Sequence, residues 1–188
     1  MTALIFAARE GDLDSARLLV AAGADVNALG ADGKNALGLA IFNGNYELAA
    51  FLVDSHSNVN QADAQRFTPL FWAVDRRNME TAPNFPWMVT ADPLPLIKKL
   101  LDAGANPNAI VNNTPRARMR EGSPRIVFAT ALMRAAFAGD LELCKVLLAH
   151  GADPMVVSTD GETVLSAAAG LAFIQGYHRG KSPAERLE

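Results

Sequence analysis

Hydrophobic residues recur in short amphipathic blocks that repeat along the chain with a spacing of 33 residues. One block, TALIFAAREGDLDSARLLVAAGADVNA, covers residues 2–28, and a close copy, TALMRAAFAGDLELCKVLLAHGADP, covers residues 130–154. In each block, a glycine and an acidic residue divide two apolar runs, and a Gly-Ala-Asp segment follows the second run. The pattern predicts two short helices joined by a tight turn in every block.

The residues at the block edges fit this prediction for physical reasons. The first helix of each pair follows a residue whose side chain accepts a hydrogen bond from a free backbone N–H: Thr2, Asn35, Thr68, Thr130 and Thr163. Glycines are expected where a turn requires a backbone conformation that other residues adopt only at a cost. They are expected between the helices and at the left-handed end of the second helix, at Gly11, Gly44, Gly139, Gly23, Gly104 and Gly151.

Leucine pairs mark the second helix of three blocks. These pairs are Leu18–Leu19, Leu100–Leu101 and Leu147–Leu148. They are expected to be buried against the neighbouring block, because stacked helix pairs share one continuous core.

Five such blocks share one register, and in this the chain resembles the ankyrin-repeat family. The resemblance implies an all-α solenoid of stacked helix-turn-helix units with hairpin-like fingers. It also implies protein recognition on a concave face and at the fingertips, and it supplies no family-wide active site. The long insertions between and within repeats are similar to those of a subset of bacterial ankyrin proteins.

The register predicts a single ankyrin-repeat domain over residues 1–188, which we expect to be a fragment of a longer array. The repeats and insertions are expected at 1–31, 32–62, 63–109 with an insertion at 79–93, 110–155 with an insertion at 112–127, and 156–188, incomplete, with an insertion at 171–181. The insertions leave open whether the concave face is accessible, since a loop can fold over it.

Composition narrows the function classes. The net charge of −3 offers no footprint for a polyanion, so no nucleic-acid partner is expected. The single cysteine, Cys144, excludes an internal disulfide or a cysteine-based metal cluster, and fits a reducing compartment. No apolar run approaches the length of a membrane span, and no signal peptide is expected. We expect a monomer without cofactor or metal, in the cytoplasm, or in the periplasm as part of a longer secreted protein.

Candidate binding residues follow from the register. The two exposed residues before each interhelical glycine are the usual contact positions implied by the resemblance, and the fingertips Asp32, Asp63 and Asp160 are expected to adjust the charge of the surface. The candidates are Phe42, Asn43, Asp75, Arg76, Arg134, Phe137, Asp32, Asp63 and Asp160. Phe42 and Phe137 are expected to be exposed aromatic anchors, with cover by a loop of the same chain as the alternative. Arg134 either reaches an acidic residue such as Asp102 or extends to the groove.

Other motifs give weaker evidence for a binding site. The segment NFPWMV at 84–89 is a binding loop or, as we favour, a loop pinned by Phe85 and Trp87. The arginines at 116–125 are expected to be solvated. The phosphate-loop-like run at 176–182 is one residue too short for a nucleotide site. His56 and His150 stand at helix ends, where a capping role is the ordinary one.

The sequence therefore favours a non-catalytic protein-interaction module. The alternative is a structural or regulatory arm of a larger protein whose active domain lies outside this chain. An enzyme is disfavoured, because the chain shows neither a nucleophile–base pair nor paired carboxylates at catalytic spacing.

Overall fold

The computed structural model describes residues 2–78, 91–111 and 128–169. The chain divides into two compact units, which we describe separately. Unit 1 comprises Met1–Arg77 with Pro83–Asn106, and unit 2 comprises Asn78–Ala82 with Pro107–Glu188. The insertions at 112–127 and 171–181, most of the insertion at 79–93, the NFPWMV segment, the arginines at 116–125 and the run at 176–182 lie outside the described residues.

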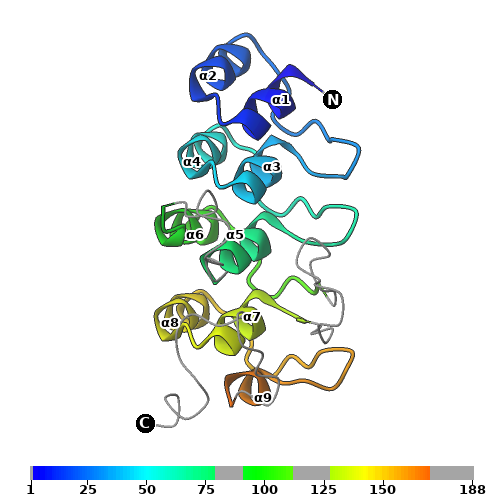
Figure 1. Ribbon diagram of the computed structural model, residues 1–188, viewed down its shortest axis with the longest axis vertical. Coiled ribbons are helices and arrows are strands. Elements are labelled where there is room, and N and C mark those ends of the chain that lie inside the picture. The colour runs from blue at the N-terminus through cyan, green and yellow to red at the C-terminus, as the bar shows by residue number, and fades with distance from the viewer. Residues whose placement is uncertain (1, 79–90, 112–127, 170–188) are drawn as a thin grey trace, which may run out of the picture. The chain divides into compact units, whose positions relative to one another are not determined.

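Unit 1 contains three helix pairs. They are α1 (Ala3–Glu10) with α2 (Leu13–Ala21), α3 (Ala36–Asn43) with α4 (Tyr46–Asp54), and α5 (Pro69–Arg77) with α6 (Leu94–Asp102). Within this unit α1, α3 and α5 lie side by side in one row, and α2, α4 and α6 form the adjacent row (Figure 1). The loops at 22–35 and 55–68, which we call the first and second finger, project on the free side of the α1–α3–α5 row. This is the all-α, stacked helix-turn-helix arrangement that the sequence predicts.

Unit 2 contains α7 (Ala131–Ala138), α8 (Leu141–Ala149) and α9 (Val164–Ala168). Here α7 packs against both α8 and α9. Before α7 the chain is held by a backbone hydrogen bond of 2.9 Å, which the Val111 N–H donates to the Ala129 carbonyl.

The first helices begin as the sequence predicts. The Thr2 hydroxyl accepts from the Ile5 N–H at 3.3 Å, and the Asn35 side chain accepts from the Gly38 N–H at 2.9 Å. Equivalent caps are made by Thr68, Thr130 and Thr163. Two residues beyond the first four caps a leucine is buried in the core: Leu4, Leu37, Leu70 and Leu132; Leu165, two residues beyond Thr163, is exposed. Cap and core residue together fix where each helix begins and which face it buries.

The second helices end in a left-handed residue. The predicted glycines adopt it, with φ of 86° at Gly23, 88° at Gly104 and 83° at Gly151. In the second repeat this position is His56, which has a φ of 61°. His56 therefore stands in the strained position of the turn itself, whereas His150 caps α8 with Nδ1 2.7 Å from the Val146 carbonyl oxygen.

Replacing His56 with glycine is expected to raise the free energy of unfolding by about 0.5–1 kcal/mol. A left-handed conformation costs an L-residue about 1–2 kcal/mol, part of which is offset by the greater freedom of glycine in the unfolded chain. The measurement is a denaturant titration of both proteins. As the control, Gly23→Ala should lower stability by about 1 kcal/mol, because an added Cβ would meet no atom within 4 Å and φ alone opposes it. Loss of stability in His56→Gly would contradict the strain argument.

Asparagine side chains link successive repeats. The Asn58 N–H donates to Asn27 Oδ1 at 2.7 Å, and the Asn106 N–H donates to Asn60 Oδ1 at 2.8 Å. In unit 2 the Asp153 N–H donates to Asn108 Oδ1 at 2.7 Å. These bonds satisfy loop N–H groups that lie outside any helix, so they keep neighbouring repeats in register.

The leucine pairs differ from the prediction at two positions. Leu19 is half-buried and Leu147, Leu100 and Leu101 are buried, but Leu18 is 73% exposed and Leu148 is 46% exposed. Counted back from the terminal glycine, the two pairs stand one residue apart: Leu18 precedes Gly23 by five residues, and Leu148 precedes Gly151 by three. Leu101 holds the same position as Leu148, three residues before its terminal glycine, yet Leu101 is buried, so register alone does not decide which leucine the core covers.

Candidate functional site

Three of the predicted binding residues, Asp32, Phe42 and Asp63, come together in unit 1 around Lys34. The Lys34 ammonium lies 2.9 Å from Asp32 Oδ2 and 3.1 Å from Asp63 Oδ2. It also lies 5.2 Å from the centroid of the Phe42 ring and 5.5 Å from that of Trp72. We call these five residues the Lys34 cluster. Two carboxylates and two aromatic rings thus surround one cation at distances that favour ion pairing and cation–π attraction.

The aromatic side of the cluster is rigidly packed. Phe42 from α3 meets Trp72 from α5 edge to face, with ring centroids 4.9 Å apart and an interplanar angle of 86°. Phe67 of the second finger packs on the other side of Trp72, with centroids 4.7 Å apart. Trp72 and Phe67 are buried, whereas Phe42 keeps partial exposure. Phe42 is therefore a half-exposed aromatic held in one orientation by buried neighbours.

Asp63 was predicted as an exposed fingertip, and this is wrong. Its side chain is buried, with Oδ1 accepting from the Gln65 and Phe67 N–H groups, each at 2.9 Å. Its Oδ2 accepts from Trp72 Nε1 at 3.1 Å as well as pairing with Lys34. Asp63 corresponds in register to Gly30 and Ser158, which stand at the base of their finger turns. A short acidic side chain at this place closes the turn on itself, as aspartate commonly does.

Asp32 and Asp160 lie at the exposed tips, as predicted. Partial burial of Asp32 works against ionisation, but hydrogen bonds from the Lys34 side chain and backbone outweigh it, so the pKa of Asp32 is lowered. The Asp32 carboxylate is therefore ionised near neutral pH and attracts cations.

The remaining candidates of unit 1 divide by exposure. Asn43 and Arg76 are half-exposed, and Asn43 Nδ2 donates to the Leu39 carbonyl at 3.0 Å. Asp75 is 1% exposed, so the prediction that it belongs to an exposed pair is wrong. Next to it, the buried Arg77 forms an ion pair with Asp92, which stands two residues before α6. This ion pair connects the end of α5 to the start of α6, and its two residues lie on either side of residues 79–90 in the sequence.

In unit 2 two of the predicted candidates, Arg134 and Phe137, are covered. Phe137 is 1% exposed and Arg134 is 3% exposed, so the prediction that Phe137 is an exposed anchor is wrong. Phe128 packs against Phe137 with centroids 5.4 Å apart, and the Arg134 guanidinium lies 5.3 Å from the centroid of the Phe128 ring. Arg134 Nη2 also donates to the Asn78 carbonyl oxygen at 2.8 Å. The alternative, cover by the same chain, therefore describes this site.

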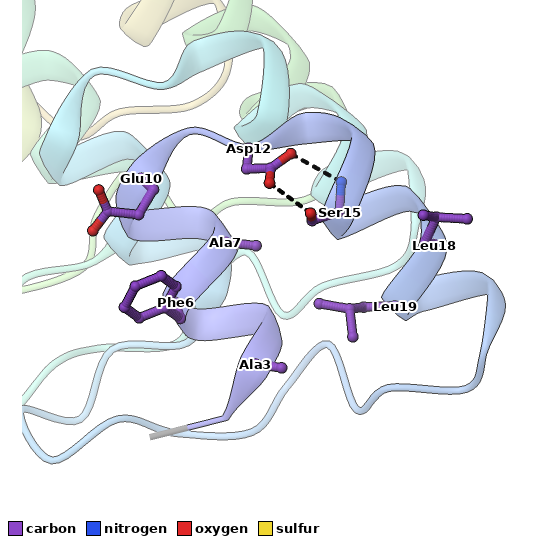
Figure 2. Close-up of a pocket in the computed structure, with 8 residues that line it drawn as sticks. All are labelled: Ala3, Phe6, Ala7, Glu10, Asp12, Ser15, Leu18 and Leu19. Carbon is purple, nitrogen blue, oxygen red and sulfur yellow. Dashed lines mark hydrogen bonds between the residues drawn. The ribbon is translucent and has the colours of Figure 1, made fainter.

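An open groove of about 600 Å³ lies along α1 and α2 (Figure 2). Ala3 and Ala7 of α1 face Leu19 of α2 across it, and Phe6 also lines it. At one end the Ser15 N–H and hydroxyl both donate to the Asp12 carboxylate, at 3.0 and 2.5 Å, and they lower the pKa of Asp12.

The groove corresponds to a surface that is filled one repeat later. The register equivalents of Ala3, Ala7 and Leu19 in the second pair are Ala36, Ala40 and Leu52, and all three are buried. The α3–α4 face that holds them packs on the α1–α2 pair. The groove is therefore the stacking face of the α1–α2 pair, which explains its apolar lining.

Cys144 is expected to be an unreactive thiol. Burial first, and the nearby Asp140 carboxylate second, raise the pKa of Cys144 to about 11. Since the thiolate is the reactive form, we predict that alkylation near pH 8 proceeds roughly a hundredfold more slowly than for a free thiol, and accelerates as the pH rises toward about 11. The same chain in denaturant provides the reference rate. Equal rates in the folded and unfolded chain would contradict the assignment.

Two features of the described residues concern membrane insertion and metal binding. Within those ranges, no helix has both the length and the apolar character needed to cross a membrane. Over the same ranges, His, Cys, Asp and Glu side chains form no group of three or more that could hold a metal ion.

Comparison with known families agrees with the architecture. A family model described as ankyrin repeats in three copies matches residues 4–83, and a model of the single ankyrin repeat matches residues 129–159. A search of curated proteins found no match. Ankyrin repeats are generally protein–protein interaction modules and are typically non-catalytic. Caps, paired helices and left-handed turns recur in one register in both matched ranges, and the chain belongs to the ankyrin-repeat family.

Proposed function

We propose that the chain binds a segment of a partner protein on the finger side of unit 1 and catalyses no reaction. The finger side is the surface that α3, α5 and the two fingers form around the Lys34 cluster. The observation that carries the proposal is Phe42, a partly exposed aromatic side chain fixed at 86° against the buried Trp72. Aromatic side chains held in this way make effective anchors, because little conformational freedom is lost when a partner covers them.

Polar groups surround this anchor in a way that suits a mixed-charge segment. Asn43 follows Phe42 directly, Arg76 is half-exposed on α5, and the Asp32 side chain is 55% exposed at the tip of the first finger. An apolar anchor with a polar rim is the usual organisation of a protein-binding surface. In unit 2, Asp160 remains an exposed candidate, whereas Arg134 and Phe137 are too deeply buried to contact a partner without rearrangement.

Site-specific photo-crosslinking tests the proposal. A benzophenone amino acid at Asn43 should form a covalent adduct with a partner from a lysate of the source organism. The same residue at Lys98, which is exposed on α6, should not form that adduct. An adduct of equal yield from both positions, or from Lys98 alone, would place binding elsewhere on the chain.

A second variant pair separates binding from folding. Phe42→Ala should weaken capture of the crosslinked partner by about tenfold or more, since loss of an anchoring aromatic costs about 2 kcal/mol or more. Leu18→Ala removes an exposed apolar side chain from α2 and should leave capture unchanged. Circular dichroism establishes that both variants are folded. Full retention of binding by folded Phe42→Ala would refute Phe42 as the anchor.

A further inference from the structure

The Lys34 cluster has the composition of a binding site for an ammonium group. The Asp32 carboxylate accepts a hydrogen bond from the Lys34 ammonium at 2.9 Å, and the Asp63 carboxylate lies 3.1 Å from the same ammonium. The rings of Phe42 and Trp72, at 86° to one another, complete the surroundings of the cation. The Lys34 side chain that occupies this site is 11% exposed. A cation in such surroundings gains both ion pairing and cation–π attraction, the latter worth about 0.5–2 kcal/mol.

Asp63 and Trp72, two of the four residues around the Lys34 ammonium, are held by contacts that do not involve Lys34. Asp63 is fixed by the Gln65, Phe67 and Trp72 N–H groups, at 2.9, 2.9 and 3.1 Å. Trp72 is packed between Phe42 and Phe67. The site is therefore preorganised, and it should keep its shape when the Lys34 side chain leaves.

The charge of the two carboxylates favours a cation in this site. Among the described residues, two carboxylates flank one ammonium, because Lys34 is the cation in ion-pair distance of both Asp32 and Asp63. Lys34 itself belongs to the first finger, and its stem can turn toward solvent without breaking a helix. The Gly30 N–H, which donates to the Lys34 carbonyl at 2.8 Å, holds the finger backbone independently of that stem.

We propose that this site receives a lysine side chain of the partner segment, and that Lys34 is the resident side chain which the partner's lysine replaces. The inference rests on the proposed function and names the chemistry of its partner. Because carboxylate oxygens accept N–H hydrogen bonds from the bound group, the site favours a primary ammonium over a quaternary one, which has no N–H to donate.

The test vacates the site and refills it with a small cation. In the full chain carrying Lys34→Ala, n-butylammonium should shift the NMR signal of the Trp72 indole N–H, which donates to Asp63, in a saturable manner. The chain has two tryptophans, so Trp87→Phe assigns the signal. The neutral n-butanol and the quaternary butyltrimethylammonium serve as matched controls and should produce much smaller shifts. Adding Phe42→Leu to Lys34→Ala should weaken the butylammonium effect.

A peptide measures the competition directly. The peptide acetyl-Gly-Gly-Lys-Gly-Gly-amide should bind Lys34→Ala about tenfold more tightly than it binds the natural chain, because a tethered competitor acts at an effective concentration on the order of millimolar. Its glutamine analogue should bind neither. Equal affinity of the lysine peptide for both chains, or no butylammonium shift in a folded Lys34→Ala chain, would overturn the inference.

Two further outcomes are also decisive. If Lys34→Ala does not fold, refolding it with butylammonium should restore the dispersed indole signal. Butanol is the control for this rescue. If butylammonium, like butanol, fails to restore the signal, the result counts against the site. The NMR and peptide measurements need no natural partner. Loss of the Asn43 crosslink would therefore refute the proposed function alone, and loss of the butylammonium shift would refute the lysine site alone.

Discussion

Leu100→Ala is expected to lower the free energy of unfolding by about 2–5 kcal/mol, the usual cost of a cavity at a fully buried leucine. Leu100 is 0% exposed on α6, which packs against α4 and α5. Helix pairs in a repeat array are stabilised by their neighbours, so the cavity weakens the α5–α6 pair and its contact with the pair before it. A chemical denaturation curve followed by circular dichroism measures the change.

The matched control is Leu19→Ala, the same substitution at the same register position of the α1–α2 pair. Leu19 and Leu100 each stand four residues before the terminal glycine of their helix pair, Gly23 and Gly104. Leu19 lines the open groove and is half-buried, so its loss should cost less than about 1 kcal/mol. Equal costs for the two variants would show that stacking against a preceding pair does not account for the burial of Leu100.

The fold was predictable because its determinants are local and repeated. Thr2, Thr130 and their equivalents cap helices through bonds to N–H groups three residues away, which sequence spacing alone specifies. The left-handed φ of Gly23 and Gly104 follows from their place after an apolar run. His56 shows the limit of reasoning by residue type, since the register assigns it the turn conformation while its identity suggested a cap.

Exposure at the candidate site was harder to predict. Phe42 and Phe137 hold the same register position, yet Phe42 keeps partial exposure and Phe137 is buried beneath Phe128. Phe128 precedes α7 by three residues and lies outside any helix, so no helical spacing fixes the direction of its side chain. Burial of this kind depends on tertiary contacts between segments, which helical spacing does not encode.

Lys34 and Trp72, the centre and one wall of the cluster, were not among the predicted site residues. The repeat register nevertheless contained a signal for both residues. Trp72 is the equivalent of Phe6 and Leu39 on the first helices, and Lys34 directly precedes the cap residue Asn35. What the register did not supply was the direction of the Asp63 carboxylate, which turns inward because three N–H groups bind it. The Lys34 cluster thus depends on one side chain whose orientation is set by its finger turn.

Asp63→Ala is expected to destabilise unit 1 by about 2–4 kcal/mol. The substitution removes the acceptor of the Gln65, Phe67 and Trp72 N–H groups and leaves the Lys34 ammonium without one of its two carboxylates. Buried donors without an acceptor cost about 1–3 kcal/mol each, and relaxation of the finger toward water recovers part of that sum. Denaturant titration measures the stability, and the Trp72 indole N–H signal reports whether its hydrogen bond is lost.

Asp32→Ala is the matched control, because Asp32 pairs with the same ammonium from the exposed tip of the first finger. Its side chain is 55% exposed, whereas that of Asp63 is 2% exposed, and exposed ion pairs contribute about 0–1 kcal/mol. A small loss in Asp32→Ala beside a large loss in Asp63→Ala would show that the buried carboxylate holds the second finger to α5. Equal small losses would mean that packing of Trp72 against Phe42 and Phe67 maintains the cluster without the carboxylate. The preorganisation of the lysine site would then rest on its aromatic walls.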